Sequence, residues 1–151
     1  MNKNRKNILT SGVRLEKTLL LLFLCLSLGA QAQKIHIKTG IEVLKSQNFR
    51  CLEGKRVGLI TNPTGVDNEL HSTIDILHEA PNVNLVALYG PEHGVRGDVH
   101  AGDHVSDQRD PATDLPVYSL YGKTRKATPE MLKDVDVLVY DIQDIGCRSF
   151  T

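Results

Sequence analysis

The chain has 151 residues, 40% hydrophobic and 24% charged, a composition that fits one globular domain or part of one. Its 18 basic and 18 acidic side chains give a formal net charge of zero. Five basic residues and one acidic residue lie within the first 32, so the remainder carries 13 basic and 17 acidic side chains, a net charge of −4. An acidic domain of this kind excludes the electrostatic pattern of a nucleic-acid-binding protein.

The N-terminus has the three parts of a secretory signal. Basic residues dominate residues 1–17, a short apolar run covers 18–28, and Ala30-Gln31-Ala32 places small residues where a signal peptidase reads them. The apolar run is too short for a comfortable membrane span, and an uncleaved anchor is the alternative. We expect cleavage after Ala32, export to the periplasm or the extracellular space, and no stable membrane anchor on the mature chain.

Predicted helices and strands alternate along the mature chain. Thr39-Gly40-Ile41-Glu42 has the spacing of a capping box and predicts a helix to about residue 47. A helical period covers residues 68–79, and Thr128-Pro129 predicts the start of a short third helix. Apolar runs predict a short strand at 35–37 and four stronger strands at 56–61, 84–89, 115–120 and 135–140. The fourth strong strand is apolar enough to be central, and the polar residues 98–114 predict a long surface loop.

This alternation predicts an α/β fold. Strands that are nearly continuous apolar runs are typical of a mostly parallel sheet with helices on both faces. In such a sheet the carboxyl ends of the strands share one edge, where ligands bind. Polar side chains that follow the strands are expected at this edge, and they are Asn62, Glu92, His93, Asp141, Gln143 and Asp144.

The loop after the second strong strand is the best candidate for a site. The apolar run breaks at Gly90-Pro91, after which Glu92, His93 and Arg96 are interleaved with glycines. Glycines allow tight turns and close approach of a ligand, and titratable side chains on such a loop are typical of active sites. The alternative is an ordinary connection with a salt bridge between Glu92 and Arg96.

The sequence lacks the motifs of several common classes of α/β protein. No Gly-x-Gly-x-x-Gly follows a strand, and there is no Walker loop and no Gly-x-Ser-x-Gly elbow. Residues with hard metal-binding groups do cluster, and they are Glu92, His93, Asp98, His100, Asp103 and His104. Their irregular spacing favours a solvated loop, so we expect no metal and no other cofactor, with a metal-dependent hydrolase as an alternative function.

Four motifs, in this order, resemble one protein family. They are Leu59-Ile-Thr-Asn-Pro-Thr-Gly65, Leu88-Tyr-Gly-Pro-Glu-His-Gly-Val-Arg-Gly97, Leu115-Pro-Val-Tyr-Ser-Leu-Tyr-Gly122 and Asp136-Val-Leu-Val-Tyr-Asp-Ile-Gln-Asp-Ile-Gly146. Over about residues 40–151 the chain is similar to the bacterial exo-β-N-acetylmuramidases, long catalogued as a domain of unknown function.

The resemblance implies an exported glycoside hydrolase that releases N-acetylmuramic acid from the non-reducing end of peptidoglycan fragments. It also implies a Rossmann-like N-terminal domain, a second domain, and an active site in the cleft between them. The glutamate of the Pro-Glu-His-Gly motif, the proposed catalytic acid of the family, corresponds to Glu92. Such an acid must stay protonated near neutral pH, which burial against apolar walls favours.

The other edge residues are predicted to bind substrate. Asp141 and Asp144 are candidates for the second carboxylate of glycoside hydrolysis, which could equally lie in the second domain. His93 and Arg96 suit substrate hydroxyls or the lactyl carboxylate, and Asn62 and Gln143 complete the set. The structural alternatives are an ion-pair set for His93 and Arg96, an Asx turn for Asn62, and helix capping for the two aspartates.

The chain departs from the family pattern in small ways at Val95, Asp114, Cys147 and Ser149, and in a large way in length. Family members are much longer. We therefore expect residues 33–151 to be an incomplete N-terminal domain, without the second domain and inactive as a fragment. A non-catalytic module that binds muropeptides or sugars is consequently another alternative function.

Overall fold

The fold is described from a computed structural model, which covers residues 37–98, 100, 108–144 and 146. The predicted signal peptide, most of the short strand predicted at 35–37, and the candidate metal ligands Asp103 and His104 lie outside these residues. The helices are α2 (Gly40–Ser46), α3 (Thr73–Glu79) and α4 (Pro129–Leu132), with a 3₁₀ turn at Arg50–Leu52. The strands are β1 (Arg56–Thr61), β2 (Asn84–Gly90), β3 (Gln108–Arg109), β4 (Pro116–Ser119) and β5 (Val137–Asp141).

Local sequence signals start the helices. At α2 the backbone N–H of Thr39 donates to the Glu42 carboxylate at 2.6 Å, which confirms the predicted capping box. At α4 the Thr128 hydroxyl caps the first turn and Pro129 occupies the first helical position, as predicted. None of the helices in the described residues has the length and apolar content needed to cross a membrane.

Four parallel strands and one antiparallel strand form a sheet in the order β3-β4-β2-β1-β5. β1 pairs with β2 and β5, β2 pairs with β4, and β3 runs antiparallel to β4. Taken in chain order, the parallel strands lie in the spatial order third, second, first, fourth, as in doubly wound folds. The predicted α/β fold with a mostly parallel sheet is therefore confirmed.

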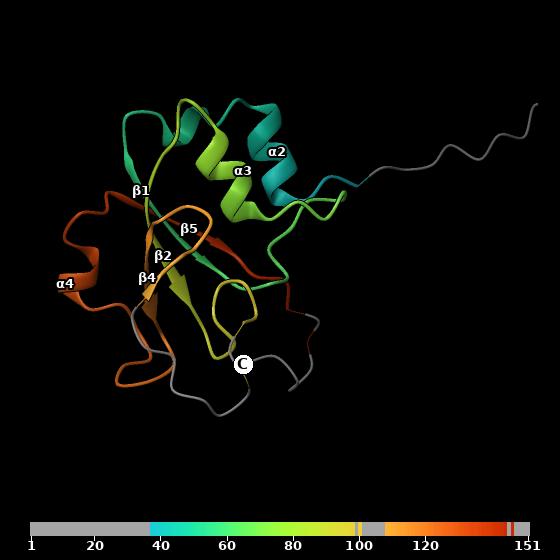
Figure 1. Cartoon of the computed structure of the whole chain (residues 1–151). Helices are drawn as coiled ribbons and strands as arrows, with labels where there is room; N and C mark the ends of the chain where they lie inside the picture. The colour runs from blue at the N-terminus through green and yellow to red at the C-terminus, as the bar shows by residue number, and fades with distance from the viewer. Residues whose placement is uncertain (1–36, 99, 101–107, 145, 147–151) are drawn as a thin grey trace, which may run out of the picture. The chain divides into compact units, whose positions relative to one another are not determined.

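Helices cover both faces of this sheet (Figure 1). α2 and α3 lie on one face, where Ile74 and Leu77 of α3 join Val57 of β1 in the hydrophobic core. On the other face lies α4, and the hydroxyl of the buried Tyr89 donates to the Met131 carbonyl of this helix at 2.7 Å. Burial raises the pKa of Tyr89 to about 12, so this hydroxyl stays a donor.

One prediction about the start of an element was wrong. α3 begins at Thr73 and not at residue 68, because Leu70 has a φ of +66° and Ser72 caps the helix by accepting from the Ile74 N–H. β5, predicted to be central, pairs with β1 at the end of the described part of the sheet, and Tyr140 on it is 69% exposed. An apolar run indicates that a strand can be buried, but the crossover connections decide which strands it pairs with in the sheet.

Candidate functional site

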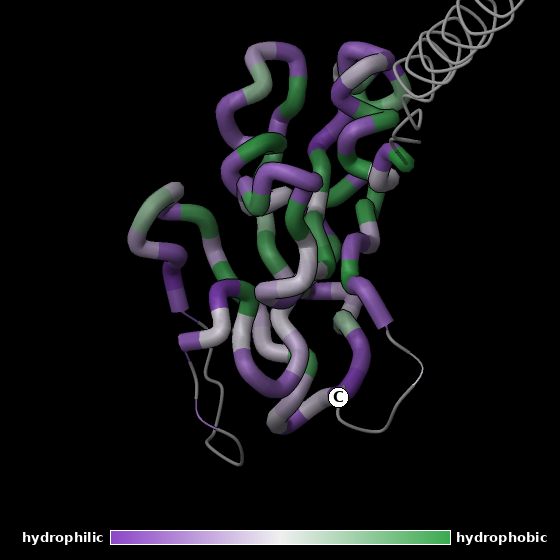
Figure 2. Tube along the Cα trace, turned by 90° about the vertical axis from the view of Figure 1, so that its right-hand side faces the viewer, coloured by the Kyte–Doolittle hydropathy of each residue, from purple (hydrophilic) through white to green (hydrophobic). Residues whose placement is uncertain are grey.

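The candidate site lies at the carboxyl edge of the sheet, where β1 and β5 meet. The spatial order of the strands reverses between these two, and α3, which follows β1, and α4, which precedes β5, lie on opposite faces, so this is the switch point where α/β folds bind ligands. The loops at this end, at the bottom of the view, are mainly hydrophilic, whereas green apolar segments concentrate in the strands above (Figure 2). The structure places every predicted site residue in these loops or at the strand end, although their roles in binding and catalysis stay predictions.

Asn62 shapes the loop after β1. Its buried Oδ1 accepts a bond from the Thr64 N–H at 3.0 Å and another from the Thr64 hydroxyl at 2.6 Å. The Thr64 Oγ1 in turn accepts the backbone N–H of Gln143 at 2.9 Å. These contacts match the Asx turn that was the structural alternative for Asn62, and they join the loops after β1 and β5.

Asp141 closes the end of β5 against β1 and α3. Its carbonyl accepts the Thr61 hydroxyl at 2.8 Å, and its Oδ2 accepts the hydroxyl of the fully buried Thr73 at 2.5 Å. Gly65 packs directly on this junction, because a Cβ there would lie 2.2 Å from the Thr61 Oγ1 and 2.8 Å from the Asp141 carbonyl. The half-buried Asp141 carboxylate is therefore bound to the start of α3. The exposed Asp144 instead accepts the Gly146 N–H at 2.7 Å, within its own turn.

Glu92 lies on the tight turn that follows β2. The Gly94 N–H donates to the Pro91 carbonyl at 3.0 Å, and Gly94 has a φ of +75°, which glycine adopts at little steric cost. The Leu120 N–H at the end of β4 donates to the Gly90 carbonyl at 2.8 Å and fixes the start of the turn. Glu92 is half-buried in this arrangement and the neighbouring His93 is exposed.

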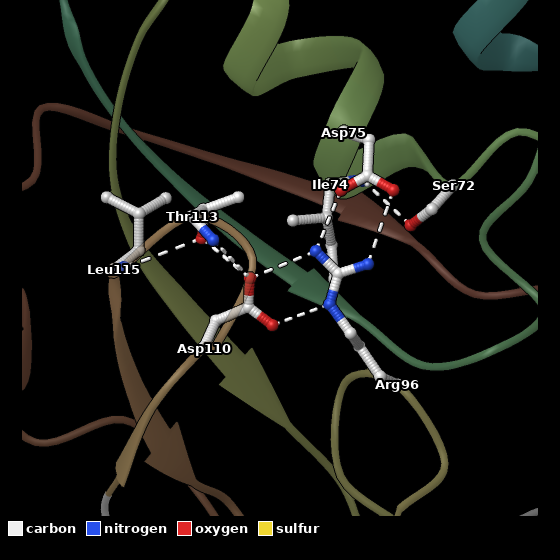
Figure 3. A network of polar contacts seen from close by, with 7 residues as sticks. All are labelled: Ser72, Ile74, Asp75, Arg96, Asp110, Thr113 and Leu115. Atoms are coloured by element: carbon white, nitrogen blue, oxygen red, sulfur yellow. Dashed lines mark hydrogen bonds and ion pairs between the residues drawn. The ribbon is translucent and has the colours of Figure 1, made fainter.

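The Arg96 guanidinium is held by two carboxylates from other parts of the chain (Figure 3). Its Nε and Nη2 donate to the Asp110 carboxylate at 2.5 and 2.9 Å, and its Nη2 and Nη1 donate to Asp75 at 2.7 and 3.3 Å. The Asp110 side chain is 1% exposed and also accepts the N–H and hydroxyl of Thr113. This geometry favours the structural ion-pair set that was the alternative for Arg96.

The ion pairs shift the pKa of both partners. The hydrogen bonds from Arg96 first, and then those from Thr113, lower the pKa of Asp110 to about 2 against the opposing effect of burial. The hydrogen bonds to Asp110 and then to Asp75 raise the pKa of Arg96. Asp110 and Arg96 are therefore both charged at neutral pH.

Thr73, Asp75 and Asp110 are among the contributing residues that were not predicted. Ser72 ahead of an apolar period is a helix-start signal, and it could have placed Thr73 and Asp75 in the first turn of α3 at the sheet edge. Asp110 lies in the polar stretch predicted to be a surface loop, and its burial has no local sequence signal. Its role depends on a contact with Arg96, 14 residues away.

A different group of potential metal ligands occurs in the described residues. Oxygen or nitrogen atoms of Asp67, Glu69 and His71 lie within 4.8 Å of one another. Asp67 Oδ1 accepts the backbone N–H groups of Glu69 and His71, both at 2.9 Å, and Oδ2 lies 3.1 Å from the His71 Nδ1. These bonds close a turn, which accounts for the proximity of the three side chains.

Comparisons with known proteins agree on one family. Residues 57–151 match the family described as "Exo-beta-N-acetylmuramidase NamZ, N-terminal". Over 120 residues the chain is 58% identical to "Peptidoglycan beta-N-acetylmuramidase NamZ" of Bacillus subtilis (strain 168), covering 80% of this chain and 29% of that protein.

Two crystal structures of DUF1343 family proteins from Bacteroides fragilis NCTC 9343 are also similar. One is 84% identical with a TM-score of 0.69, over 78% of this chain and 29% of that chain. The other is 36% identical with a TM-score of 0.56, over 72% of this chain and 26% of that chain. The chain thus spans less than a third of the length of each of these relatives.

Proposed function

Because this chain belongs to the family of N-terminal exo-β-N-acetylmuramidase NamZ domains, we propose that it is the N-terminal part of a glycoside hydrolase of that type. The enzyme would release N-acetylmuramic acid from the non-reducing end of peptidoglycan fragments. The observation that carries the proposal is the high identity to a protein named as a peptidoglycan β-N-acetylmuramidase. The position of Glu92 on a tight turn at the carboxyl edge of the sheet agrees with it.

In the proposed reaction Glu92 acts as the general acid. Its carboxyl group donates a proton to the glycosidic oxygen as the bond to the muramic acid carbon breaks. A second carboxylate activates water or attacks the sugar, and Asp141 is the better candidate in this chain. It lies at the switch point beside β1, whereas the Asp144 side chain is exposed in its own turn. The remaining length of the relatives offers further candidates.

Release of N-acetylmuramic acid tests this proposal. We expect a full-length version, in which the chain is continued to the length of its relatives, to cleave the disaccharide MurNAc-β-1,4-GlcNAc. Mass spectrometry of the products measures the release, and a disaccharide with N-acetylglucosamine at the non-reducing end is the control that should stay intact. Binding without release would favour a sugar-binding module, and loss of release after EDTA treatment would favour a metal-dependent hydrolase.

Export is a further part of the proposal. Expressed with its native start in a Gram-negative bacterium, the protein is expected to lose residues 1–32, because small residues at Ala30 and Ala32 follow the apolar run. Intact-mass measurement of the exported protein gives the new N-terminus directly. An Ala30→Leu variant, which removes one of the small side chains, should be cleaved poorly. A mature protein that keeps residues 18–28 would show a membrane anchor instead.

A further inference from the structure

The loop 91–97, which carries Glu92, is held at its start by the bond from the Leu120 N–H to the Gly90 carbonyl and at its C-terminal side by packing. Val95 is buried in the core, and Gly97 packs on Pro63 of the loop after β1. Gly94 lies between Glu92 and these attachments, in a left-handed conformation that is accessible to glycine together with many others. The place of the Glu92 backbone therefore depends on how firmly the turn as a whole is held against its surroundings.

Arg96 supplies such a contact because its two partners belong to separate, well-anchored segments (Figure 3). Asp75 is in the first turn of α3, on one face of the sheet. Asp110 lies in the segment that precedes β4 in the chain. Its backbone N–H donates to the Leu115 carbonyl at 2.9 Å, and its carboxylate accepts the Thr113 N–H. A planar guanidinium that donates to two fixed carboxylates has one favourable orientation, which also fixes the backbone of the loop.

The same contacts disfavour the predicted role of Arg96 as a ligand for the lactyl carboxylate. Four of its five N–H donors point to Asp75 and Asp110. Two carboxylates beside one guanidinium leave the cluster with a net negative charge, which repels an anionic substrate group.

We propose that Arg96 and Asp110 are positioning residues that set the place of the Glu92 carboxyl group relative to the glycosidic oxygen. This inference rests on the proposed function, in which Glu92 is the general acid. A displacement of about 1 Å of a catalytic group lowers a rate by about 100-fold, so a loop held less tightly would be costly. Lysine at position 96 keeps the charge but cannot span both carboxylates with a planar fork.

The test uses two variants of the full-length version, Arg96→Lys and Asp110→Asn, with Arg56→Lys as the matched control. Arg56 is a second guanidinium held by two carboxylates, Asp134 and Asp136, but it lies at the opposite end of β1. Each protein is assayed on MurNAc-β-1,4-GlcNAc and on the 4-nitrophenyl β-glycoside of N-acetylmuramic acid. The second substrate has a leaving group that needs little protonation. Its turnover therefore measures the rest of the active site, independently of proton donation by Glu92.

We expect kcat on the disaccharide to fall by about 10- to 100-fold in Arg96→Lys and Asp110→Asn, with KM changed less than about threefold. Turnover of the 4-nitrophenyl glycoside should stay close to that of the unmodified protein. Arg56→Lys should leave both activities unchanged. Hydrogen exchange of the peptide covering residues 89–98 should become faster in the two loop variants and not in the control.

Equal losses on both substrates would overturn the proposal, because they indicate general damage to the site. An increase in KM alone would instead support the predicted role of Arg96 in substrate binding. If the unmodified protein cleaves neither substrate, the proposed function fails, and hydrogen exchange still decides whether Arg96 holds the loop. Unchanged exchange in Arg96→Lys and Asp110→Asn would then overturn the positioning role on its own.

Discussion

Replacing Glu92 with glutamine is expected to abolish release of N-acetylmuramic acid by the full-length version while leaving substrate binding largely intact. Glutamine keeps the shape and one oxygen acceptor of the side chain, but it cannot donate the proton that the leaving oxygen needs. General acid catalysis contributes about 10²- to 10⁴-fold, or roughly 3–5 kcal/mol of activation free energy. Initial rates on MurNAc-β-1,4-GlcNAc and equilibrium binding of the same disaccharide measure the two quantities separately.

Asp98→Asn is the matched control for this experiment. It makes the same carboxylate-to-amide change on the same loop, at an exposed position further from the turn, and should cost much less activity. The deficit of Glu92→Gln should shrink on an activated 4-nitrophenyl glycoside, and neither variant should respond to added metal. Near-normal turnover of the unactivated disaccharide by Glu92→Gln would rule out its role as the acid, and Asp141 and Asp144 would be tested next.

Replacing Arg96 with methionine should destabilise the domain by about 3 kcal/mol, the lower end of the range for breaking a buried ion pair. The lower end applies because the Arg96 side chain is 27% exposed, whereas the Asp110 carboxylate is 1% exposed and would remain buried without its cation. Urea unfolding followed by pulsed hydrogen exchange of β2 and β4 peptides measures this domain within a longer protein. Arg56→Met removes a comparable but exposed ion pair and should cost much less stability than Arg96→Met.

The pH dependence of this destabilisation has a definite sign. In the unmodified protein the folded pKa of Asp110, about 2, lies below the ordinary value of 3.8, chiefly because of Arg96. Its contribution to stability is therefore present above about pH 3.8 and is lost as the pH falls toward 2. Removing Arg96 removes the chief cause of the lowered pKa, so the pKa of Asp110 rises and the variant loses less stability than the unmodified protein on acidification.

The difference in stability between the two proteins should consequently be largest above about pH 3.8 and decrease as the pH falls toward 2. Measurements at neutral pH and within this acidic range check the sign. The double variant Arg96→Met/Asp110→Leu, which removes the buried charge as well, should recover most of the lost stability. A constant difference at all pH values, or no recovery in the double variant, would show that lost packing causes the effect.

The sequence by itself determined the elements and the edge at which the site residues lie. Apolar runs marked β1, β2, β4 and β5, the capping box and the proline marked the starts of α2 and α4, and strand–helix alternation predicted a parallel sheet. From parallel strands alone it follows that Asn62, Glu92 and Asp141 lie at the same edge. These features could be predicted because each depends on the periodicity, turns or caps of a few neighbouring residues.

Only the tertiary structure decided which polar groups pair. Arg96 binds Asp75 and Asp110, 21 and 14 residues away, and Asp141 binds Thr73, 68 residues away. The pairing of β5 with β1 was also decided by the crossover through α4 and not by its apolar sequence. Carboxylates with very different roles look alike in a sequence, because burial and the distance to a cation arise only when separate segments are packed together.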